Sequence, residues 1–140
     1  AQHAQAARLE ASGQTKKAKA QIFVAIASHE EALRRSREIF GPRHPKVAMA
    51  AAGLGDALLA ASRPGEAAAR LQEALAIPGP TALETAQIEL VLAKALWRSG
   101  GSKSRARALA RHAEQTLRTQ EGTPASALAD DVAAWRRAPK

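Results

Sequence analysis

About one residue in four is alanine, whereas aromatic residues make up only 3% of the chain. Alanine is the best helix former among the amino acids and a poor strand former. Apolar residues reach 46%, so the chain can form a core. Because alanine fills little space, such a core is dense only where helices approach one another closely. The composition therefore predicts an all-α protein built from close-packed helix pairs.

Glycine and proline divide the chain into helical segments, the first break falling at Ser12 and Gly13. Glycine ends helices through its backbone freedom, and proline through its missing N–H. Thr81 and Glu84 have the spacing of a capping box, and Thr123 precedes a proline at a first helical position. Short links favour antiparallel neighbours. The pattern predicts seven helices, over about residues 1–12, 15–40, 46–61, 65–77, 81–99, 103–118 and 124–137.

The chain carries a formal net charge of +8. This excess favours acidic partners, among them acidic proteins, nucleic acid and anionic membrane surfaces; the alternative is that it reflects coding bias and solubility. Cysteine is absent from the sequence, which excludes disulfides, thiolate metal sites and a cysteine nucleophile. The longest apolar run, residues 22–27, is far shorter than the ~18 residues of a membrane span. We therefore expect a cytoplasmic protein without a membrane span.

Small residues recur at matched places in successive helix pairs, at an interval of about 38 residues between the middle and last pairs. Small side chains are needed where two helices cross closely, because larger ones would push the helices apart. The predicted structural repeat residues are Gly55, Ala67 and Ala74 in the middle pair, Ala93, Ala106 and Ala113 in the last pair, and Ala6, Ala18 and Ala25 in the first pair.

This spacing resembles the tetratricopeptide repeat. The sequence Gly-Pro-Arg-His-Pro at 41–45 is similar to the loop between repeats of the kinesin-light-chain type, which is common in large bacterial regulatory proteins. The resemblance implies a right-handed α-α superhelix of about three helical hairpins and a capping helix, in one domain of residues 1–140. The repeats would cover about residues 1–40, 46–78 and 81–118, and the capping helix about 124–137. The large aromatic residues usual in the family are missing: the corresponding positions hold Ala51, Ile22, Leu71 and Ala110.

No catalytic or metal-binding pattern stands out. None of the four histidines pairs with another at helical spacing, so we expect no metal site. His29 with Glu30 and Glu31 is better explained as a charged helix surface than as an acid–base group. Gly53-Leu54-Gly55 follows no predicted strand and lies inside a helix, so it is not a phosphate loop. We expect no cofactor, no catalytic residues and no enzymatic activity.

In the tetratricopeptide repeat family the first helices of successive hairpins line a concave surface, and the resemblance places a partner there. Lys94 and Arg98 flank Trp97, which would suit an acidic or C-terminal segment of a partner. The alternative is that Trp97 packs between hairpins. Asparagine, which the carboxylate clamp of chaperone-binding members uses, is absent. The predicted partner-binding residues are Met49, Asp56, Gln87, Leu90, Lys94, Trp97 and Arg98.

The preferred function is a scaffold or adaptor module that binds a protein or peptide, with self-association also open. One alternative, resting on the family resemblance, is a regulatory or sensor region of a larger bacterial signalling protein. Another is a basic nucleic-acid-binding helical domain, for which the candidate residues are Lys103, Arg105, Arg107, Arg111 and His112. The spacing of the first three of these residues spreads them around a helix, and aromatic side chains for base stacking are scarce.

Overall fold

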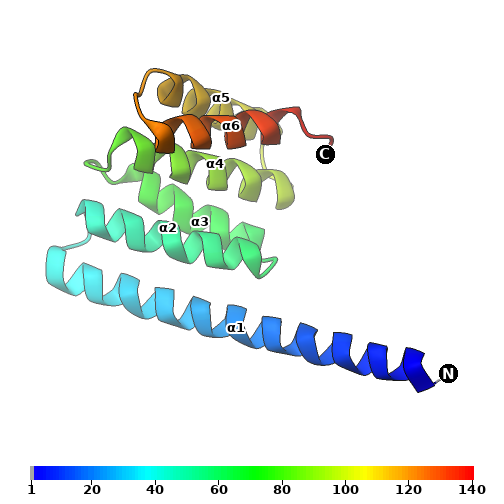
Figure 1. The fold of residues 1–140 in the computed structure, drawn as a ribbon. Helices are drawn as coiled ribbons and strands as arrows, with labels where there is room; N and C mark the ends of the chain where they lie inside the picture. Colours follow the sequence, from blue (N-terminus) through cyan, green and yellow to red (C-terminus); the bar gives the residue numbers. More distant parts are fainter. Residues whose placement is uncertain (1) are drawn as a thin grey trace.

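Six helices, and no strand, account for the regular structure of residues 2–140, the part of the chain that the computed structural model describes. The helices stack side by side from α1 to α6 (Figure 1). Their bounds are Gln2–Phe40 for α1, Pro45–Ala60 for α2, Pro64–Ala76 for α3, Ala82–Arg98 for α4, Lys103–Arg118 for α5 and Thr123–Arg137 for α6. The predicted all-α repeat superhelix is confirmed.

Two antiparallel hairpins form the middle of the stack. Helices α2 and α3 pair in the first and α4 and α5 in the second, while α1 covers α2 and α6 covers α5 (Figure 1). The core runs through the whole stack, with Leu54, Leu71, Leu92, Leu117 and Val132 buried on successive helices. The order of helices sets the first helices of the hairpins, α2 and α4, next to each other, and residues of the two helices are in contact.

Prolines and local hydrogen bonds set the starts of the helices. Pro45, Pro64 and Pro124 each lie in a first turn, where the missing N–H is no loss. His44 is the N-cap of α2, and its Nδ1 accepts a hydrogen bond from the Lys46 N–H at 3.1 Å. The His44 ring also stacks on Phe40, with the ring centroids 4.7 Å apart. The loop at 41–45 is therefore held by contacts from both of the helices that it joins.

The predicted break at Ser12 and Gly13 is wrong, because both residues lie inside α1. A glycine inside a helix costs only about 1 kcal/mol relative to alanine, and the alanine-rich segments on each side favour the helix. The Thr15 hydroxyl donates a hydrogen bond to the Ala11 carbonyl at 2.8 Å, as threonine does within a continuous helix. The segment about 1–40 is therefore one helix and not a hairpin; Ala1 lies outside the described residues.

The small residues predicted for the first pair are placed differently from those of the other pairs. Ala6 and Ala18 are exposed and Ala25 is half-buried, because residues 4–21 of α1 lie outside the core and extend past α2 (Figure 1). Helix α1 instead packs on α2 through Ile26 and Leu33. The residues predicted for the other two pairs are all buried: Gly55, Ala67, Ala74, Ala93, Ala106 and Ala113.

Candidate functional site

A groove lies between α2 and α4, on the side where the first helices of the two hairpins are neighbours. Met49 and Asp56 of α2 and Gln87 and Val91 of α4 line it, together with Ala52 and Gly53. Its volume is about 280 Å³. The small side chain of Ala52 leaves this space open, since a larger residue there would fill it. Three of the predicted partner-binding residues, Met49, Asp56 and Gln87, therefore lie in one groove.

The helical period places the groove residues Gln87 and Val91 on the same face of α4 as two basic residues. Gln87, Val91, Lys94 and Arg98 follow one another at intervals of four, three and four, so they lie in one stripe along the helix. Gln87 and Arg98 are exposed, and Lys94 and Val91 are half-buried. The guanidinium of Arg98 donates to the Leu59 carbonyl at 3.4 Å and so reaches the end of α2.

Leu90 and Trp97 lie on a neighbouring stripe of α4, seven residues apart. Leu90 is only 5% exposed and belongs to the core, so the structure does not offer it to a partner. Trp97 meets Trp135 of α6, with the ring centroids 6.1 Å apart and the rings at 89°. The predicted set is thus divided: Trp97 lies in a second pocket and is absent from the lining of the groove between α2 and α4.

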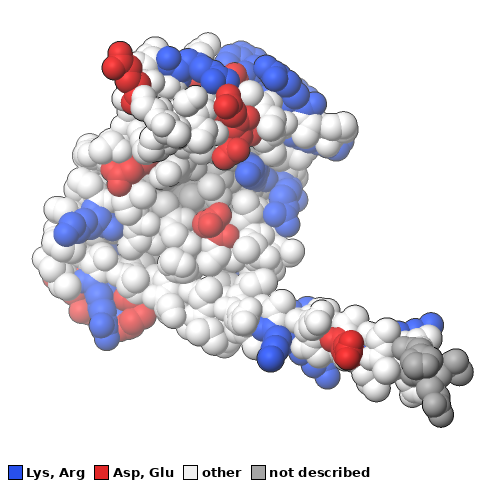
Figure 2. Space-filling model, in the orientation of Figure 1, with Lys and Arg blue, Asp and Glu red and all other residues white. Residues whose placement is uncertain are grey.

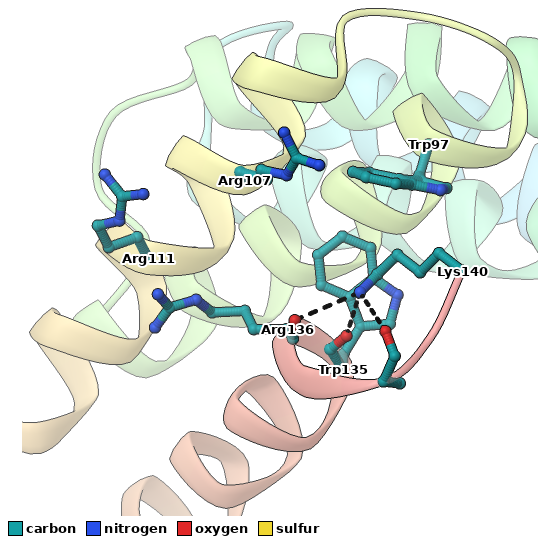
Figure 3. A pocket seen from close by; sticks show the side chains of 7 residues that line it. Trp97, Arg107, Arg111, Trp135, Arg136 and Lys140 are labelled. Carbon is teal, nitrogen blue, oxygen red and sulfur yellow. Dashed lines mark hydrogen bonds between the residues drawn. The ribbon is translucent and has the colours of Figure 1, made fainter.

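This second pocket, hereafter the two-tryptophan pocket, opens between α4, α5 and α6 and has a volume of about 350 Å³ (Figure 3). Cationic side chains surround the indoles: Lys103 Nζ, Arg107 Cζ and Lys140 Nζ lie 5.0, 5.1 and 5.4 Å from the Trp97 ring centroid. Such distances are typical of cation–π contacts. The residues that line the pocket are Trp97, Arg107, Arg111, Trp135, Arg136, Ala138 and Lys140.

The interval between the helices gives a sequence signal for Trp135. It follows Trp97 by about 38 residues, the same interval that separates Gly55 from Ala93. The two tryptophans therefore occupy matching places in α4 and α6, which are one repeat interval apart. Arg107 and Arg111 are one turn apart on α5, which aligns them on one face. The interval between the two tryptophans and the basic residues of α5 are together the sequence signal for the pocket.

Charged side chains cluster at both ends of the stack. On α1, Arg34 and Arg35 both hydrogen-bond Glu31, which lowers the pKa of the Glu31 carboxyl to about 2. This cluster is solvent-exposed and belongs to one helix, as expected for a charged helix surface. At the other end, blue Lys and Arg side chains gather over α5 and α6, with acidic ones among them (Figure 2).

One buried carboxylate lies inside the α4–α5 hairpin. Glu89 Oε2 is 2.7 Å from His112 Nδ1, while Glu89 Oε1 is buried and has no hydrogen-bond partner among the described residues. Burial raises the pKa of the Glu89 carboxyl, and the contact with His112 opposes the rise. His112 itself is mostly exposed. The contact joins the two helices of the hairpin, and neither residue lines the groove or the two-tryptophan pocket.

Two further searches concern metals and membranes. Residues 2–140 contain no group of three or more His, Asp or Glu side chains placed to hold a metal ion. In the same range no helix combines the length and the apolar character that crossing a membrane requires.

The stacked hairpins and the groove along their first helices define the chain as an α-helical repeat protein. A model of the family described as tetratricopeptide repeat matches residues 5–78, more than half of the chain. The chain therefore belongs to the tetratricopeptide repeat family, whose repeats generally mediate protein–protein interaction. Comparison with curated proteins found no match. Comparison with solved structures found none either.

Proposed function

We propose that this chain is a non-enzymatic scaffold or adaptor module that binds a segment of a partner protein in the groove between α2 and α4. The observation that carries the proposal is the open groove itself, where Met49 and Val91 offer apolar contact and Asp56 and Gln87 offer exposed polar groups. Methionine adapts its shape to different partners. The polar groups can hydrogen-bond the backbone of an extended segment, which gives such a segment its register.

Charge along α4 gives the bound segment a direction. Lys94 and Arg98 continue the Gln87 stripe toward the C-terminal end of the helix, whereas Asp56 lies on α2 within the groove. We place an acidic part of the partner toward Lys94 and Arg98, because opposite charges across an interface select the partner and its orientation.

Glycine and histidine in the loop at 41–45 support the kinesin-light-chain-like type of repeat. The proposal includes a cytoplasmic location, with which a cysteine-free chain is compatible.

A groove-filling variant tests the proposal. Ala52→Phe puts a large side chain into the groove, and Ala108→Phe puts the same side chain on an exposed position of α5 outside both the groove and the two-tryptophan pocket. Each variant is used as bait in a lysate of the source organism, after circular dichroism has confirmed its helix content. A protein retained by the original chain and by Ala108→Phe, but lost with Ala52→Phe, is the expected result. Equal retention by all three baits would contradict a site in this groove.

A regulatory role within a larger signalling protein is compatible with the same groove. That role concerns the protein in which the module works, and it does not change how the module binds a partner. The family resemblance supports this reading, and the sequence of the complete gene product would test it.

Self-association is a separate proposal that rests on α1. Leu9, Phe23 and Val24 are each more than 60% exposed on this helix, which lies at one end of the stack (Figure 1). Exposed apolar residues on an end helix favour contact with a second copy. Sedimentation of the chain and of a Phe23→Ser variant tests it: a dimer that Phe23→Ser weakens is expected, and a monomer at all concentrations would contradict the proposal.

A further inference from the structure

The two-tryptophan pocket holds every tryptophan of the chain, Trp97 and Trp135, and tyrosine is absent from the sequence. Three separate helices contribute to it, with Trp97 on α4, Arg107 and Arg111 on α5, and Trp135 on α6 (Figure 3). The T-shaped contact between the indoles fixes α4 against α6. Five of the seven lining residues therefore stand on helices, and Ala138 and Lys140 of the segment after α6 complete the pocket.

The basic side chains around this pocket outnumber the acidic side chains that pair with them. Arg136 is paired with Glu114, but neither Arg107 nor Arg111 forms an ion pair within residues 2–140. Like charges one turn apart on a helix repel each other and destabilise it slightly. The ammonium group of Lys140 adds to the charge while donating to the Trp135 carbonyl at 2.6 Å (Figure 3). A bound anion would relieve this repulsion.

Carboxylates match this arrangement better than nucleic-acid bases do. Guanidinium groups bind carboxylates with two parallel hydrogen bonds, and Arg107 and Arg111 present two such groups on one helix face. Stacking of a base needs an open ring face, but the Trp97 ring already contacts cations of Lys103, Arg107 and Lys140. The two rings are also at 89° to each other, so they form no continuous stacking surface.

We propose that the two-tryptophan pocket binds an acidic segment of the partner protein, with its carboxylates on Arg107 and Arg111 beside the two indoles. This inference rests on the proposed function and names where the acidic part of the partner lies. The pocket includes Trp97 near the end of α4, and Lys94 and Arg98 stand on the same stretch of that helix. The groove and the pocket therefore both use α4, through Val91 in the groove and Trp97 in the pocket.

Intrinsic fluorescence tests this inference directly, because both tryptophans of the chain line the pocket. The probe is a short blocked peptide of alternating glutamate and aspartate, and its counterpart contains glutamine and asparagine instead. We expect the acidic peptide to change the tryptophan emission saturably, with an affinity that falls as salt is added, and the amide peptide to have no effect. An acidic peptide that leaves the emission unchanged while it binds, as measured by calorimetry, would overturn the pocket as its site.

Two matched double variants separate the pocket from general attraction. Arg107→Gln/Arg111→Gln removes two charges of the pocket, whereas Lys16→Gln/Lys17→Gln removes two from the exposed part of α1 at the other end of the stack. The first is expected to weaken binding at least about tenfold, and the second to change it little. Equal weakening by both variants would overturn the inference, as would tighter binding of a single-stranded oligonucleotide that depends on the same two arginines.

The outcomes for the pocket and for the groove are independent. Loss of the captured partner with Ala52→Phe, together with no response to the acidic peptide, would refute this inference and leave the proposed function standing. A fluorescence response with unchanged partner capture by Ala52→Phe would keep the pocket as an acidic-segment site and refute the groove.

Discussion

A β-carbon added to Gly55 would lie 2.6 Å from Leu71 Cγ, although the two residues belong to different helices of the α2–α3 hairpin. Leu71 is fully buried, so its side chain has no free space into which it can move. In the next hairpin the corresponding residue Ala93 is fully buried on α4, and Ala110 is fully buried on α5. Glycine at 55 on α2 thus faces the large Leu71 on α3, whereas in the next hairpin the small Ala110 on α5 leaves room for Ala93 on α4.

Replacement of Gly55 by alanine is expected to destabilise the protein by about 1–3 kcal/mol, because the added methyl group overpacks the crossing of α2 and α3. The better helix propensity of alanine, about 1 kcal/mol, offsets only part of this loss. Urea unfolding followed by circular dichroism measures the change. A variant Gly55→Ala/Leu71→Ala, which removes the clash, should not show a destabilisation equal to the sum of the two single changes. Strict additivity would contradict the steric explanation.

Gly13→Ala is expected to stabilise the helix, in contrast to the destabilisation expected for Gly55→Ala. Gly13 lies inside α1 and a β-carbon there would have no atom within 4 Å, so only the backbone effect remains. We expect greater helix content and, if the projecting part of α1 unfolds together with the core, a stability gain of about 0.5–1 kcal/mol. Circular dichroism of both proteins at low temperature measures the helix content. A lower helix signal for Gly13→Ala would indicate that the chain turns at this glycine.

The contrast between these two glycines shows what the sequence predicts well and what it does not. Breaks that contain proline were predicted correctly, because proline lacks the N–H and fixes φ whatever surrounds it. At Gly13 no proline follows and the neighbours favour the helix, so a glycine preference of about 1 kcal/mol did not decide the structure. The consequence is large, since one continuous α1 replaces the first predicted hairpin.

Site residues followed a similar rule. Met49, Asp56 and Gln87 could be placed by the repeat pattern, because the first helices of neighbouring hairpins share a face. Leu90, Lys94 and Trp97 also follow one another at intervals of four and three, so the helical period alone assigns them to one face of α4. The helical period does not separate two neighbouring stripes of one helix. The packing of α6 on the stack separates them here, because Trp97 contacts Trp135 of α6.

Thr81→Ala tests the capping box at the start of α4. The Thr81 hydroxyl accepts a hydrogen bond from the Glu84 N–H at 3.1 Å, and the Glu84 carboxylate accepts one from the Thr81 N–H at 2.9 Å. Removal of the hydroxyl is expected to lower the free energy of unfolding by about 1 kcal/mol. Thr81→Ser keeps the hydroxyl and serves as the control. If the serine and alanine variants unfold at the same urea concentration, the side-chain cap contributes nothing to stability.

The Glu89 carboxyl gives the hairpin of α4 and α5 a dependence on pH. Its pKa is raised in the folded protein by burial, so the folded state favours the protonated form more than the unfolded state does. A raised pKa stabilises the fold fully below the ordinary value of about 4.5, and this contribution is lost as pH rises through the folded-state pKa. Ionised Glu89 is therefore a destabilising group at neutral pH, where His112 is its hydrogen-bond partner.

Glu89→Gln is accordingly expected to stabilise the protein near neutral pH, by on the order of 1 kcal/mol, and to have little effect below the ordinary pKa of a glutamate. Glutamine has almost the same volume, remains uncharged, and keeps an oxygen that can accept from His112. Urea unfolding at several pH values measures the difference. A gain that is equally large in acid would show that the charge of Glu89 is not its cause.

His112→Ala should act in the opposite direction at neutral pH, because it leaves the buried Glu89 carboxylate without its hydrogen-bond partner. The expected loss is about 1–3 kcal/mol, the usual cost of an unsatisfied buried polar group. In the Glu89→Gln background the same change should cost less, since an unpaired amide is easier to bury than an unpaired carboxylate. An equal loss in both backgrounds would assign the effect of His112 to packing of its ring on α4, and not to the charge that it faces.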